Sequence, residues 1–147
     1  EDYDGAVPSG NSVAALALLR LGKITDRKEY TDMAEKTLLL FSENMTNGPS
    51  AVPYLLQALD FLVHEPRRAV ITGDPKSGGA RDLIAAAHAA YQPNKVVLGV
   101  TGPVEEFAKT LPEEKQSAVY LCTGSACQPP TSDAFKLREM MASKTLP

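Results

Sequence analysis

Three apolar runs of this chain each end in a Thr-Gly pair, and such pairs can contact a ligand when they follow buried strands. The pairs are Thr72-Gly73, Thr101-Gly102 and Thr123-Gly124. Helix-like segments separate the runs and follow the last one, which is the order of successive β-α units. Because a parallel sheet binds ligands beyond the carboxyl ends of its strands, we predict a sheet-edge site at Gly73, Thr101, Gly102 and Thr123. Tight strand-to-helix turns also require glycine, so a purely structural role is the alternative.

The glycine-rich loop at residues 73–79 could present backbone N–H groups to a phosphate. It does not match a P-loop, because Gly78 is followed by Gly79-Ala80 and Lys76 comes too early. A flexible turn between strand and helix accounts for this composition better. We therefore predict no nucleotide or other cofactor, and the ligand classes left open are a small sugar or an anion.

The two cysteines, Cys122 and Cys127, form a candidate redox pair. Their C-x4-C spacing differs from the C-x-x-C of thioredoxin-type motifs. A structural zinc site needs about four ligands, and His64 and His88 lie far away in the sequence, so we predict no metal. A reversible disulfide requires the loop to fold back, and the alternative is two small residues, one of them buried at a strand end. So few cysteines are typical of a reducing compartment, which predicts a cytoplasmic protein.

Acidic and polar side chains precede the first predicted helix, with Asp4, Ser9 and Asn11 in one short loop. Carboxylates in such a loop can act as acids and bases on sugars. Acidic residues are also favoured at a helix N-terminus for electrostatic reasons, and this structural role is the simpler explanation.

Three helices are predicted ahead of the strands. The segment 11–21 is apolar nearly all round and should form a buried helix that ends at Gly22. Asp26 and Glu29 form a capping box for the second helix, and Pro53 falls in the first turn of the third. Two partners hardly cover the first helix, which predicts that further helices are missing. The chain begins without methionine and reads as a piece of a longer protein.

The apolar pattern changes near Pro66, which predicts a helical segment at 1–65 and a small α/β domain at 66–147. The fold class is α/β, and the second part should be a three-stranded parallel β-α-β-α-β-α sheet. The 147 residues carry a net charge of −3 without any basic block, so nucleic acid is not an expected partner. No apolar run reaches roughly 18 residues, so we expect no membrane partner either.

Three phrases of the sequence resemble one known family. The first is Asp-Gly-Ala-Val-Pro-Ser-Gly-Asn-Ser-Val-Ala at 4–14, followed by Leu-Leu-Arg-Leu at 18–21. The second is Ala-His-Ala-Ala-Tyr-Gln-Pro-Asn-Lys at 87–95, and the third is Cys122-x4-Cys127 with the Gln-Pro-Pro-Thr-Ser-Asp that follows. In this order they look like the carboxyl-terminal part of the spermatogenesis-associated protein 20 family, often called thioredoxin domain-containing. We expect the chain to be a bacterial member.

The resemblance implies a parent chain with an amino-terminal thioredoxin-like domain followed by a six-hairpin (α/α) toroid similar to sugar epimerases and glycosidases. Residues 1–65 would then be the last hairpins of that toroid. By this analogy Asp4, Ser9 and Asn11 would lie on a sugar-binding loop, although Val7 stands where a Glu is common. The thioredoxin-like domain is absent here, so its redox residues are not assigned to Cys122 or Cys127.

The function predicted for the chain is that of a structural and interaction module without a complete catalytic set of its own. Its expected partners are the upstream toroid helices and the thioredoxin-like domain of the parent chain. The alternative is that it forms part of a carbohydrate-active, epimerase- or glycosidase-like toroid whose sugar site is lined by the loop at residues 4–11.

Overall fold

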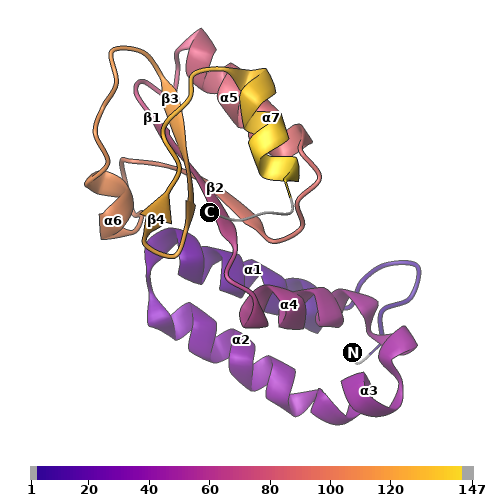
Figure 1. The fold of residues 1–147 in the computed structure, drawn as a ribbon. Helices are drawn as coiled ribbons and strands as arrows, with labels where there is room; N and C mark the ends of the chain where they lie inside the picture. Colours follow the sequence, from indigo (N-terminus) through magenta and orange to yellow (C-terminus); the bar gives the residue numbers. More distant parts are fainter. Residues whose placement is uncertain (1–2, 144–147) are drawn as a thin grey trace. The chain divides into compact units, whose positions relative to one another are not determined.

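The computed structural model describes residues 3–143 of the chain, which divides into two compact units at residues 1–64 and 65–147 (Figure 1). The first unit is helical and the second is a sheet covered by helices. The overall α/β class predicted from the sequence is confirmed.

The helical unit consists of α1 (Gly10–Thr25), α2 (Lys28–Leu40), the short α3 (Ser42–Asn47), a 3-10 turn η1 (Pro49–Ala51) and α4 (Pro53–Val63). Helix α1 packs against both α2 and α4. The core of this unit lies between them, and its largest wholly buried side chains are Phe61 and Leu55. Pro53 lies in the first turn of α4, as predicted, where its missing N–H breaks no helical hydrogen bond.

The ends of the first two helices differ from the sequence prediction. Helix α1 continues past Gly22 to Thr25. Gly22 instead lies where α1 and α2 approach each other closely, since a Cβ there would lie 2.6 Å from Thr31 Oγ1. Asp26 does not cap α2 but ends α1 in the left-handed conformation at φ 56°. The residue before α2 is Arg27, whose side chain makes no capping hydrogen bond, so the predicted capping box is wrong.

Helix α1 has two apolar faces, as its composition predicts. One is buried within the unit and includes Ala15, Leu16 and Leu19. The opposite face carries Val13 and Leu21, each 44% exposed, with exposed alanines between them at positions 14 and 17. Because these residues recur every three or four positions, they form an apolar stripe of the kind that normally packs against another element.

The α/β unit contains β1 (Arg67–Thr72), α5 (Gly78–Ala89), β2 (Lys95–Gly99), α6 (Glu106–Lys109), β3 (Ala118–Thr123), β4 (Ala126–Cys127) and α7 (Ala134–Ala142). The strand order is β2-β1-β3-β4, with β1 parallel to β2 and antiparallel to β3, which is in turn antiparallel to β4. The prediction of three purely parallel strands is therefore wrong. The sheet has four strands and is mixed.

The physical reason for this error lies in the burial of β3. All but its last residue are buried, so both faces of the strand are apolar. Strands that are apolar on both faces are typical of parallel sheets, and the sequence therefore predicted the parallel direction. The chain between β2 and β3 holds only the four-residue α6. An antiparallel neighbour needs no long helical crossover, and this short helix is consistent with the reversed direction.

Helices α5 and α7 lie side by side on one face of the sheet (Figure 1). Alternate strand residues point into this layer, among them Ala69 and Ile71 of β1 and Leu121 of β3, where they pack with Leu83 and Leu137 of the helices. Side chains that alternate with these point to the other face. There the Tyr120 hydroxyl donates a hydrogen bond to the Pro112 carbonyl at 3.1 Å.

Cations at the first residues of β1 and β2 bind the carboxyl ends of the two helices. Arg67 donates to the carbonyls of Met140 and Met141 at 3.2 and 2.7 Å, at the end of α7. Lys95 donates to three carbonyls at the end of α5, at 2.6 to 3.0 Å. Positive charge at this end of a helix is favoured by the helix dipole and by the unpaired carbonyls. These bonds fix how far each helix lies along the sheet.

Candidate functional site

A pocket of about 210 Å³ opens where the parallel strands β1 and β2 end, next to α5. This is the edge at which open α/β sheets commonly bind ligands. Two of the predicted site residues, Gly73 and Thr101, line it. The remaining lining residues are Ile71, Pro75, Ile84, His88, Val97, Leu98, Gly99 and Val100.

The walls of this pocket are mainly apolar, and its polar side chains are the exposed His88 and Thr101. Gly102 directly follows Thr101 and adopts φ 83°. Within residues 3–143, no group of three or more His, Cys, Asp or Glu side chains could hold a metal ion. The pocket therefore has the mainly apolar lining of a small binding site.

Thr123 and Gly73 lie at opposite ends of the paired strands β3 and β1. Because β3 runs antiparallel to β1, Thr72 pairs with Ala118 at one end and Arg68 pairs with Cys122 at the other. The structure thus brings Gly73 and Thr101 to one pocket and separates Thr123 from them. The sequence could not reveal this division, since the three Thr-Gly pairs look alike.

The role of Gly73 is a conformational one that can be tested. It adopts φ 90°, and a Cβ there would lie 3.1 Å from the Ser117 Cα. We expect Gly73→Ala to lower the free energy of unfolding by about 1–3 kcal/mol because of this left-handed backbone and the close contact. Urea denaturation followed by circular dichroism measures the effect. Gly78→Ala is the matched control, since nothing lies within 4 Å of the Cβ position there, and equal effects of the two changes would contradict the explanation.

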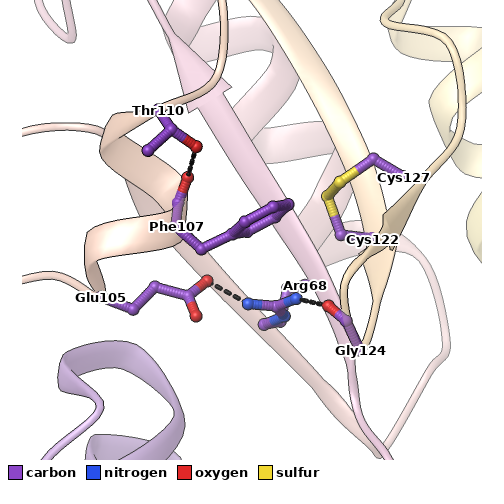
Figure 2. A network of polar contacts seen from close by, with 7 residues as sticks. All are labelled: Arg68, Glu105, Phe107, Thr110, Cys122, Gly124 and Cys127. Carbon is purple, nitrogen blue, oxygen red and sulfur yellow. Dashed lines mark hydrogen bonds and ion pairs between the residues drawn. A yellow bond between two sulfur atoms is a disulfide. The ribbon is translucent and has the colours of Figure 1, made fainter.

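A second group of polar contacts, missed by the sequence analysis, centres on Arg68 of β1 (Figure 2). Its guanidinium forms an ion pair with Glu105 and donates to the Gly124 carbonyl in the β3–β4 turn. The Phe107 ring lies over it at 5.4 Å, and both charged side chains are nearly buried, at 7% and 11% exposure. Arg68 Nε is buried without a hydrogen-bond partner among the described residues. The one signal in the sequence was an arginine directly adjoining the apolar run 69–71.

Next to this network, Cys122 and Cys127 form a disulfide across the β3–β4 hairpin (Figure 2). The two residues are directly opposed in the antiparallel pair. The loop thus folds back as a disulfide requires. The alternative of two separate small residues is wrong, although Cys122 is indeed buried at a strand end.

The carboxylate of Asp4 is buried and accepts hydrogen bonds with both oxygens. One oxygen accepts from the Ser9 N–H at 2.8 Å, and the other accepts from the N–H groups of Tyr54 and Leu55 at 2.8 and 3.1 Å. Burial by itself would raise the pKa of Asp4, but the hydrogen bonds from Ser9, the Ser12 side chain and the start of α4 lower it below its ordinary value. Asp4 therefore joins the loop before α1 to the first turn of α4.

The other two residues of the predicted sugar-binding loop lie at the start of α1. Ser9 is the N-cap, and its hydroxyl accepts from the Ser12 N–H at 3.2 Å. Asn11 is half-buried in the first turn of α1. The structure thus gives Asp4 and Ser9 defined roles in holding the loop, and any contact of the three residues with a sugar stays a prediction.

Of the helices in residues 3–143, none combines the length and apolar character that crossing a bilayer requires. The cytoplasmic location stays a prediction. No protein-family model matches the chain, and no solved structure gives a significant match.

The chain is similar to animal proteins along nearly its whole length. It is 35% identical to spermatogenesis-associated protein 20 of Homo sapiens over 96% of the chain, and 34% identical to the Mus musculus protein of the same name. An uncharacterised protein of Caenorhabditis elegans is 30% identical over 95% of the chain. The chain spans only 19% of the human and mouse proteins and 20% of the worm protein. These relatives lend no support to the expected bacterial membership. The chain is therefore homologous to one segment of spermatogenesis-associated protein 20, which supports the family resemblance that its motifs indicate.

Proposed function

We propose that this chain is a structural and interaction module of a longer protein, in which neighbouring helices of the same parent chain cover α1. The observation that carries this proposal is the second apolar stripe of α1, with Val13 and Leu21 exposed on it. Exposed apolar faces of this kind usually mark contacts with other elements. The animal relatives are about five times as long as the chain, so a parent of similar length would supply such helices.

Other exposed apolar side chains of the helical unit support the same interpretation. Leu39 and Leu40 at the end of α2 are 72% and 75% exposed, and Val63 at the end of α4 is 62% exposed. Each of these aliphatic side chains would gain hydrophobic free energy if a neighbouring element removed it from water. The family resemblance suggests an (α/α) toroid as the larger assembly, with this unit as its last hairpins, and a module of that kind closes the ring without taking part in chemistry.

The alternative of a carbohydrate-active parent rests on the analogy with toroid enzymes. It would place Asp4, Ser9 and Asn11 on the sugar-binding loop. Because both oxygens of Asp4 already accept backbone hydrogen bonds, the geometry favours an architectural role for this carboxylate over acid–base catalysis. We therefore prefer the non-catalytic function.

The proposal is tested by adding charge to the exposed stripe with the double variant Val13→Glu/Ala17→Glu. In the 147-residue chain both positions are exposed, so the free energy of unfolding should change by less than about 0.5 kcal/mol per site. In the complete parent protein the same change should destabilise by more than about 1 kcal/mol per site, because the charges would be buried in a helix contact. Chemical denaturation of both proteins measures the difference.

The matched control is Lys36→Glu, which alters charge at an exposed position of α2 outside the apolar stripe. It should have a small effect in either protein. If the double variant were equally mild in the parent protein, the stripe would face solvent there too, and the proposed role of α1 would be wrong.

A further inference from the structure

The short edge strand β4 is joined to β3 by the disulfide, and the chain just beyond it is joined by backbone hydrogen bonds. The Gln128 N–H donates to the Leu121 carbonyl at 2.9 Å, and Val119 and Thr131 exchange two hydrogen bonds. Strand β4 itself contains two residues, and its register with β3 consists of the pairs Cys122 with Cys127 and Thr123 with Ala126. A two-residue strand at a sheet edge contributes few ladder hydrogen bonds and little buried surface. The covalent bond between Cys122 and Cys127 therefore constrains the turn at residues 123–126, while the chain beyond it stays paired with β3.

The two sulfur-bearing residues differ in how accessible they are. Cys122 is fully buried at 0% exposure, whereas Cys127 is half-buried on the edge strand. Thiol–disulfide exchange requires an incoming thiolate to reach one sulfur along the direction of the S–S bond. Solvent access thus favours attack on Cys127 Sγ, with Cys122 as the sulfur that leaves.

The position of Arg68 favours the same direction of exchange. Arg68 and Cys122 are directly opposed residues of β1 and β3, so their side chains project from the same face of the sheet as neighbours. Glu105 and the Gly124 carbonyl occupy the two terminal nitrogens, while the buried Nε has no partner among the described residues. A neighbouring cation stabilises a thiolate, and a sulfur that is a more stable thiolate leaves faster.

We propose that the Cys122–Cys127 disulfide is a thiol-exchange site for a small-molecule thiol, with Cys127 as the attacked residue. The incoming thiolate forms a new S–S bond with Cys127 Sγ as the Cys122–Cys127 bond breaks, and Cys122 leaves as a thiolate that takes up a proton. A second thiol then attacks the mixed disulfide and releases Cys127. The protein disulfide gains two electrons and two protons, and the two small thiols are oxidised to their own disulfide.

Exchange at this site is coupled to the Arg68 network through the β3–β4 turn. Gly124, whose carbonyl accepts from Arg68, lies between the two cysteines within the ring that the disulfide closes (Figure 2). Breaking the bond lets the turn move away, which removes this acceptor from the guanidinium. Arg68 still forms its ion pair with Glu105, the residue before α6. Any movement of the guanidinium after it loses the Gly124 carbonyl is therefore passed through Glu105 to the segment 105–109.

The first test maps the mixed disulfide on the wild-type chain. The oxidised protein is treated with reduced glutathione, quenched in acid and analysed by tandem mass spectrometry. We expect the glutathione adduct on Cys127 in an excess on the order of tenfold over Cys122, as the difference in access requires. An adduct on Cys122, an even distribution, or no reduction while the fold stays intact would overturn the proposal.

The second test follows hydrogen exchange of backbone amides before and after reduction. Removing a cross-link from so short a loop should raise the open population of the 122–127 hairpin on the order of tenfold to a hundredfold, with a smaller rise at 105–109. The double variant Cys122→Ser/Cys127→Ser should show the reduced pattern and not respond to glutathione. If hydrogen exchange at 105–109 were unchanged in both the reduced wild type and the double variant, the coupling to Arg68 would be refuted.

Discussion

Replacing Arg68 by alanine should destabilise the α/β unit by about 3–5 kcal/mol. The substitution leaves the nearly buried carboxylate of Glu105 without its cation and the Gly124 carbonyl without its donor. It also removes the cation that lies against the Phe107 ring. Urea denaturation followed by circular dichroism, with hydrogen exchange to assign the loss to residues 65–143, measures the effect.

The matched control is Arg81→Ala on α5, where the side chain is exposed and the expected change is below about 0.5 kcal/mol. The double variant Arg68→Met/Glu105→Leu should recover much of the loss, because no buried charge is left unpaired. A loss for Arg68→Ala as small as that for Arg81→Ala would mean that the ion pair is solvated in solution.

Replacing Asp4 by alanine should destabilise the helical unit by about 2–4 kcal/mol at neutral pH. Three backbone N–H groups, of Ser9, Tyr54 and Leu55, lose the charged acceptor that they share. Two of them belong to the first turn of α4, so both the helix start and the loop before α1 lose their anchor. Hydrogen exchange at residues 9–13 and 53–57 should report the loss locally, and Glu35→Ala at an exposed position of α2 is the control.

The stabilisation by Asp4 should depend on pH in a defined direction. Its pKa is lowered in the folded protein, so its contribution is complete above the unfolded value of about 4. It is lost as the pH falls through the lower, folded pKa. The difference in unfolding free energy between wild type and Asp4→Asn should therefore shrink with acidification below about pH 4. A difference that stays constant down to pH 2 would show that the carboxylate does not act as an ionised acceptor.

The helices of the first unit were largely predictable from local sequence, while their ends were not. Apolar spacing located α1, α2 and α4, and Pro53 marked the first turn of α4. Gly22 misled because glycine serves equally as a helix stop and as a point of close helix contact, and only the neighbouring Thr31 distinguishes the two. Asp26 misled because the same side chain suits a cap and a left-handed turn.

The positions of β1, β2 and β3 were also predictable, whereas β4 and the direction of β3 were not. Direction depends on which residues pair, such as Val70 with Tyr120, and no local pattern encodes it when both faces of a strand are buried. For the same reason the sequence grouped Thr123 with Gly73 and Thr101. The Arg68 network escaped notice because its partners Glu105 and Gly124 are distant in the sequence and carry no motif.

The central position of β1 has a consequence for how the protein is made. Its Val70 pairs with Tyr120, which leaves the ribosome fifty residues later, and its other neighbour β2 also follows it in the chain. The apolar strand at 69–71 therefore emerges before either partner exists, and loop closure over such separations is slow. During translation this segment lacks its pairing partners in the sheet until synthesis has passed position 123.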